Sequence, residues 1–128
     1  MPLKIDVKAG EQFVLNNTTM HLTKSAGLVI ETKATFIRTR ELIRESDIGT
    51  AAERIHFLCQ QLYLAEDRFE TLYPLVKQAC GALLQTTPGF APLLFKLEGA
   101  LARADFYRAM KLTREMVELQ DNPLHVYS

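Results

Sequence analysis

Hydrophobic and polar residues follow one pattern up to about Asp47 and a different pattern after Thr50. Before this boundary, short runs such as Leu3-Lys4-Ile5-Asp6-Val7-Lys8 alternate between apolar and charged residues, which is the period of a half-buried strand. Turn-forming segments such as Ala9-Gly10-Glu11 and Asn16-Asn17 separate the runs. The pattern predicts five short strands in an antiparallel meander or barrel, near residues 3–8, 13–15, 18–23, 28–31 and 35–38.

From Thr50 onward, apolar residues recur at helical spacing. Thr50 is expected to cap the first helix, with Glu53 three residues later as its capping-box partner. Further helices should begin near residues 69, 92 and 105, and Pro74 should kink the second helix or mark its true start. The short connections between these helices favour antiparallel neighbours, so the pattern predicts a compact bundle of about four helices.

The predicted fold class is therefore α+β, with a small antiparallel β module over residues 1–45 followed by the helical bundle. We place the domain boundaries at 1–46 for the β module, 47–122 for the bundle and 123–128 for a tail. A sheet this small buries little surface by itself. It should therefore pack on the helices or on a second copy of itself. In the second case the protein would be a homo-oligomer.

The formal net charge of zero conceals an uneven distribution of charge. Residues 1–45 hold seven Lys/Arg against five Asp/Glu, a net charge of +2, whereas residues 46–128 hold eight against ten, a net charge of −2. Arg38, Arg40 and Arg44 follow the fifth predicted strand at even spacing, which places side chains on one face of an extended strand, and Arg44 joins the other two only if the strand continues past Glu41. If the first and fifth strands are neighbours, the basic residues line one edge of the sheet, where they could attract phosphates and read unpaired bases in RNA. The alternative is a solvated polar face that nearby glutamates partly neutralise. The candidate RNA-binding residues are Lys4, Lys8, Lys33, Arg38, Arg40 and Arg44.

The last predicted helix is apolar over a broad arc. Phe106, Tyr107 and Met110 lie on this arc, and the tail segment 124–127 could extend it. A wide arc can serve a core and a protein partner at once, although core packing alone is the simpler interpretation. The candidate partner-binding residues are Phe106, Tyr107 and Met110.

Several other classes of site find little support in the sequence. His21, His56 and His125 are scattered, Glu66-Asp67 looks solvated, and no glycine-rich phosphate loop or serine elbow is present, so we expect no catalytic site and no cofactor. A metal site built from His56, Cys59 and Cys80 would have at most three ligands, and the cysteines are better interpreted as buried, reduced thiols. No apolar run is long enough to cross a bilayer and the first residues lack a signal-peptide pattern, so we expect a cytoplasmic protein without membrane contact.

The residues resemble a known family. The segments that carry the resemblance are MPLKIDVKAGE (1–11), ATFIR (34–38) with Glu41-Leu42, TAAERIHF (50–57) running on to QLYL (61–64), and DFYRAMK (105–111). Together they are similar to the flagellar biosynthesis repressor FlbT family, from Pro2 to about Leu119. The resemblance implies a post-transcriptional regulator that associates with the 5′ untranslated region of flagellin mRNA, lowers its translation or lifetime, and works alongside the small helical protein FlaF. Some members of the family act positively, so the direction of regulation does not transfer.

Residues 3–45 also resemble, more weakly, the carbon storage regulators, which bind GGA-containing loops in mRNA. In that family the first and last strands contact RNA, and the matching positions here are Lys4 to Lys8 and Arg38 to Arg40. That family forms interlocked dimers, which the added helices here could block. In the carbon storage regulators a basic residue at the end of the last strand also contacts RNA. The spacing after the last strand differs here, so either Arg38 or Arg40 could take the role of that residue.

Two functional hypotheses follow. The leading one is a translational regulator whose β module binds the flagellin leader RNA while its helices bind a protein partner. The rival is an adaptor that binds FlaF or flagellin through its helices and meets RNA only indirectly.

Overall fold

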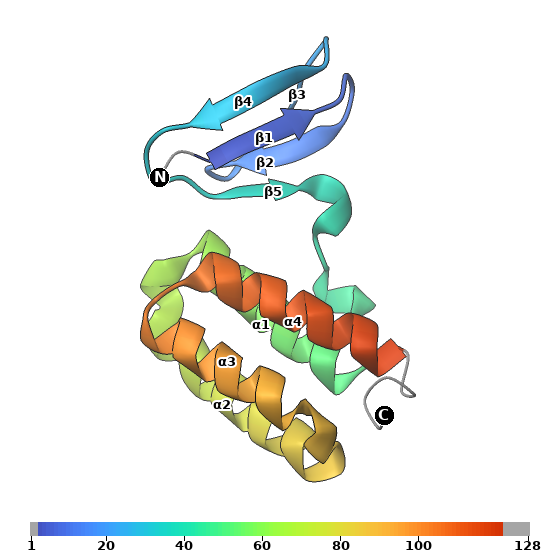
Figure 1. The fold of residues 1–128 in the computed structure, drawn as a ribbon, viewed down its shortest axis with the longest axis vertical. Helices are drawn as coiled ribbons and strands as arrows, with labels where there is room; N and C mark the ends of the chain where they lie inside the picture. The colour runs from blue at the N-terminus through green and yellow to red at the C-terminus, as the bar shows by residue number, and fades with distance from the viewer. Residues whose placement is uncertain (1–2, 122–128) are drawn as a thin grey trace. The chain divides into compact units, whose positions relative to one another are not determined.

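The computed structural model describes residues 3–121, which form two compact units, one ending at Leu42 and the other beginning at Ile43 (Figure 1). The first unit contains only short strands and a 3-10 turn, and the second contains four α-helices. The α+β class predicted from the sequence is confirmed. Within the described residues, none of the helices combines the length and apolar character that a membrane crossing requires.

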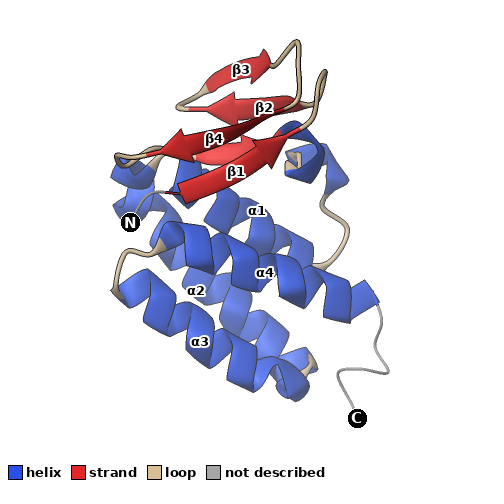
Figure 2. Ribbon diagram, turned by 45° about the horizontal axis from the view of Figure 1, so that its top comes forward, coloured by secondary structure: helices blue, strands red, loops and turns tan. Residues whose placement is uncertain are grey.

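Five strands build the first unit, and they form two separate small antiparallel sheets (Figure 2, red). The strands are β1 (Leu3–Val7), β2 (Gln12–Leu15), β3 (Thr18–His21), β4 (Ala26–Ile30) and β5 (Phe36–Arg38). β1 pairs with β4, and the second sheet has the order β3-β2-β5. The first and fifth strands are therefore not hydrogen-bonded neighbours, so the condition under which the basic residues would line one sheet edge is not met.

Turn residues and a small apolar cluster explain this arrangement. Asn16 and Asn17 both have positive φ, at 50° and 66°, and join β2 to β3 as a two-residue hairpin loop that asparagine accommodates well. The core of the unit consists of Ile5, Val7, Phe13 and Phe36. The rings of Phe13 and Phe36 lie 5.3 Å apart across the β2–β5 pair. The alternation of apolar and polar residues in β1 thus places Ile5 and Val7 inside, as the sequence pattern predicts, whereas Leu3 at the start of the strand is exposed.

The second unit contains α1 (Ala51–Leu64), α2 (Phe69–Thr86), α3 (Ala91–Ala102) and α4 (Phe106–Asp121). Thr50 caps α1 as expected, because its Oγ1 accepts a hydrogen bond of 3.1 Å from the Glu53 backbone N–H. The Glu53 carboxylate accepts in turn from the Gly49 N–H at 3.2 Å. Pro74 lies inside α2 and does not mark its start. Short 3-10 turns occur at Thr39–Glu41, Glu45–Asp47, Glu66–Arg68 and Pro88–Phe90.

The helices pack in the spatial order α2, α1, α4, α3. α1 contacts both α4 and α2 extensively, and α3 packs against α4. The shared core is drawn from all four helices and includes Ile55, Leu62, Val76, Leu97 and Met116. α2 and α3 contact each other only sparsely, so the open side of the bundle lies between them.

Candidate functional site

Arg38, at the end of β5, is held by acceptors from two other segments. Its Nη1 lies 2.8 Å from Glu11 Oε1, and its Nη2 donates to the Asp6 carbonyl of β1 at 3.0 Å. The Arg38 side chain is only 21 % exposed and its guanidinium lies over the Phe36 ring, 5.8 Å from the centroid. Arg38 therefore links the two sheets of the β unit, which is a structural role that sequence spacing did not reveal.

Arg40 shares the same carboxylate but is far more accessible. Its Nη1 lies 3.2 Å from Glu11 Oε2, and its side chain is 71 % exposed. The Lys8 backbone N–H that donates to Glu11, together with the charges of Arg38 and Arg40, lowers the pKa of the Glu11 carboxyl. Glu11 thus stays ionised between the two arginines and neutralises part of the expected cationic surface.

The remaining predicted RNA-binding residues lie on different segments of the chain. Lys4, Lys8 and Lys33 are exposed on the β unit, and Lys4 lies opposite the exposed Val29 in the β1–β4 pair. Arg44 belongs to the second unit and pairs with Asp47 at 3.4 Å. β5 ends at Arg38 and a 3-10 turn follows. The expectation that these arginines share one face of an extended strand is therefore wrong. Glu11, and not the strand period, brings Arg38 and Arg40 together.

The predicted partner-binding residues differ in exposure. Phe106 belongs to the helical core and Met110 is also buried, so of these three residues Tyr107 is the one that reaches solvent. The ring of Tyr107 lies 5.7 Å from that of Tyr63, and Lys111 Nζ lies 5.2 Å from its centroid. The tail segment 124–127 lies outside the described residues.

Two buried polar residues of the helical unit, His56 and Thr113, are hydrogen-bonded to each other. His56 is buried and its Nδ1 lies 2.8 Å from Thr113 Oγ1, which itself donates to the Met110 carbonyl at 2.9 Å. Burial, followed by the charge of Arg114, lowers the pKa of His56 to about 4. Within residues 3–121, no three His, Cys, Asp or Glu side chains gather closely enough to hold a metal ion.

The two cysteines are protonated at neutral pH. Cys59 is fully buried, and burial raises the pKa of its thiol. Burial, and secondly the charge of Glu98, raises the pKa of the partly buried Cys80 to about 11. The expectation of reduced thiols on the apolar stripes agrees with these positions, although Cys80 is not fully buried.

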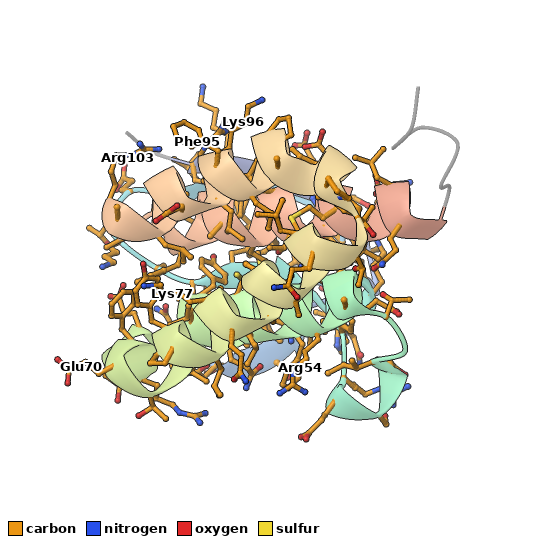
Figure 3. The ribbon with its side chains drawn as sticks, turned by 90° about the horizontal axis from the view of Figure 1, so that it is seen from below. Arg54, Glu70, Lys77, Phe95, Lys96 and Arg103 are labelled. Carbon is orange, nitrogen blue, oxygen red and sulfur yellow. The ribbon has the colours of Figure 1, made fainter. Side chains whose placement is uncertain are left out.

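An apolar groove between α2 and α3 was not predicted from the sequence. Its volume is about 320 Å³. One wall is α2, which carries Lys77, and the other is α3, which carries Phe95 (Figure 3). Phe95 is 79 % exposed, and Leu84 on the opposite wall is also exposed. Two signals could have identified this groove: Gly81 in the interior of α2, and the scarcity of charge on both helices.

Known proteins resemble this chain over nearly its whole length. The family model described as "Flagellar protein FlbT" matches residues 3–124. A probable flagellum biosynthesis repressor protein FlbT of Caulobacter vibrioides (strain NA1000 / CB15N) is 30 % identical, with all of this chain and 94 % of that protein covered. A protein with the same description from Caulobacter sp. (strain K31) is 28 % identical, with 97 % of each chain covered.

A more distant relative, from Bradyrhizobium diazoefficiens, is described as a probable flagellum biosynthesis repressor protein FlbT 1. It is 22 % identical, with 94 % of this chain and 84 % of that protein covered. No solved structure matches the chain. The resemblance seen in the residues is confirmed: this chain belongs to the FlbT family of flagellar proteins.

Proposed function

We propose that this protein represses flagellin synthesis in the cytoplasm by binding the 5′ untranslated region of flagellin mRNA through its β unit. The names of its relatives support a repressor role in flagellum biosynthesis, which is a regulatory and not a catalytic function. The direct contact with RNA, and the leader sequence as its target, are our inference from the surface chemistry of the β unit.

The observation that carries the proposal is the distribution of exposed charge on this unit. Five of its six basic side chains are exposed, whereas Glu11 and Glu41 are partly buried and lie beside Arg38. The exposed acids among the described residues of this unit are Asp6 and Glu31, so five exposed cations stand against two exposed carboxylates and the accessible charge is positive. The five exposed basic residues are Lys4, Lys8, Lys24, Lys33 and Arg40.

Arg40 is the guanidinium best placed to bind a phosphate. It is mostly exposed, and its existing carboxylate partner shows that its fork can pair with an anion. Because Arg38 continues to hold Glu11, a phosphate could replace the carboxylate at Arg40 without dismantling the β unit. We therefore reassign the contact set to Lys4, Lys8, Lys33 and Arg40, and treat Arg38 as a residue that supports the fold.

The test is a titration of the full chain with the flagellin leader RNA and a scrambled control over a range of salt concentrations. Each phosphate contact to single-stranded RNA contributes about 0.7 to the slope of log K against log salt. The double variant Lys8→Ala/Arg40→Ala should weaken binding and lower this slope by about 1.4 if both residues bind phosphates. Arg54→Ala/Lys96→Ala removes the same charge from exposed positions of the helical unit and serves as the matched control (Figure 3). Equal affinities and slopes for both double variants would refute the assignment.

A second function is supported by the exposed aromatic ring on α4. Tyr107, with Tyr63 and Lys111 beside it, presents an apolar face with a polar edge, which suits a protein contact. In this alternative the chain is an adaptor for FlaF or flagellin and contacts RNA only through them. Retention of leader RNA by the purified protein alone favours direct binding. Retention that requires FlaF, and that Tyr107→Ala abolishes, favours the adaptor.

A further inference from the structure

The helix pair α2–α3 is unusually poor in charge for a solvent-facing surface. α4 carries six charged side chains in 16 residues, whereas α2 and α3 together carry four in their 18 and 12 residues. Exposed apolar side chains occupy the same pair of helices, most prominently Phe95 and Leu84. A surface with this composition is typical of one that another macromolecule covers.

The charges that line the α2–α3 groove are arranged in a self-complementary way. Among the described residues that line it, Lys77 on the α2 wall and Glu98 on the α3 wall are the two that carry charge, and both are exposed. Lys77 Nζ lies over the Tyr73 ring at 5.5 Å. One wall is therefore positive and the other negative, with apolar side chains between them.

Gly81 faces the groove from the middle of α2, where glycine destabilises a helix relative to alanine. A Cβ built on Gly81 meets nothing within 4 Å, so packing inside this chain does not require glycine at that position. Packing within the chain does not explain the glycine at this position. The absence of a side chain on the wall of an apolar groove would allow the backbone of a second molecule to approach closely.

We propose that the α2–α3 face is the interface of a two-fold homodimer, in which the groove of one copy receives the helices of the other. A two-fold axis places residue i of one copy against residue j of the other and repeats the same contact in reverse. Lys77 and Glu98 would thus form two reciprocal ion pairs at the rim, around a centre containing Phe95 and Leu84. A second copy supplies an opposite charge for each of these two residues together with an equally apolar surface, which is why we assign it as the occupant of this face.

Charge reversal tests the pairing directly by sedimentation velocity across the micromolar range. Lys77→Glu and Glu98→Lys each convert both ion pairs into like-charge pairs, so each should weaken dimerisation by roughly tenfold or more. A mixture of the two variants should form heterodimers, because one chain then carries two acids and the other two bases at the interface. The double variant Lys77→Glu/Glu98→Lys should dimerise like the wild type.

The controls separate this interface from general effects of charge and folding. Lys96→Glu changes the net charge equally on α3 but does not line the groove, so it should leave the dimer intact. Gly81→Leu should give a folded monomer, with folding checked by circular dichroism. A wild-type protein that remains monomeric throughout the range would overturn the proposal, as would a dimer insensitive to both single reversals. Binding of an acidic or basic amphipathic helix from another protein to a monomer would instead assign the groove to that partner.

Discussion

Acidification should destabilise the helical unit through His56. The pKa of this buried imidazole is about 4 in the native state, against about 6.5 for an exposed histidine, because burial disfavours the charged ring. Between these values the unfolded chain binds a proton that the native chain rejects, so stability is intact above pH 6.5 and is lost as the pH falls towards 4. Each pH unit inside this window costs about 1.4 kcal/mol, so a shift from pH 7 to pH 5 should cost about 2 kcal/mol.

Urea unfolding followed by circular dichroism at a helical wavelength measures this cost at each pH. The matched variant is His56→Asn, whose amide nitrogen can replace the Nδ1 donor to Thr113 but cannot titrate. The variant should be less stable at pH 7 and should show a loss between pH 7 and pH 5 that is smaller by about 2 kcal/mol. If the wild type and the variant lose the same stability over this interval, His56 is not a buried neutral group and the reasoning is wrong.

Three further predictions concern other parts of the molecule. Arg38→Ala should destabilise the β unit more than Arg40→Ala does, because Arg38 is held by Glu11 and the Asp6 carbonyl; hydrogen exchange of the β-unit amides checks this order. Gln60→Ala should cost about 1–3 kcal/mol in urea unfolding, because the Gln60 amide both donates to and accepts from the Ile43 backbone at 2.9 Å. Cys80 should react with a thiol reagent at pH 8 far more slowly than a cysteine in a peptide, because its pKa is raised to about 11; equal rates would contradict the burial of its thiol.

Much of the fold could be predicted from the sequence because it depends on local signals. The alternation in residues 3–8 predicted β1, the Asn16-Asn17 pair predicted a tight turn, and Thr50 with Glu53 predicted the start of α1. These features depend on residues within a few positions of one another. The pairing of β1 with β4 rather than with β5 was not predicted, because strand neighbours depend on contacts distant in the chain.

The candidate site was harder to predict for the same reason. Even spacing suggested that Arg38 and Arg40 share a strand face, yet the strand ends at Arg38 and Glu11, 27 residues earlier, brings the two guanidinium groups together. The arc on the last helix proved to contain core residues such as Phe106, whereas the open apolar surface lies between α2 and α3. A helical stripe in a sequence does not show which of its residues a neighbouring helix covers.

We propose above all that the exposed cations of the β unit bind the flagellin leader RNA directly. Hydrogen exchange of the full chain, with and without saturating leader RNA, tests it most directly because each unit is observed separately. We expect slower exchange in peptides covering residues 3–15 and 36–42, with α2 and α3 unchanged. Protection confined to the helical unit, or an identical response to a scrambled RNA, would contradict the claim.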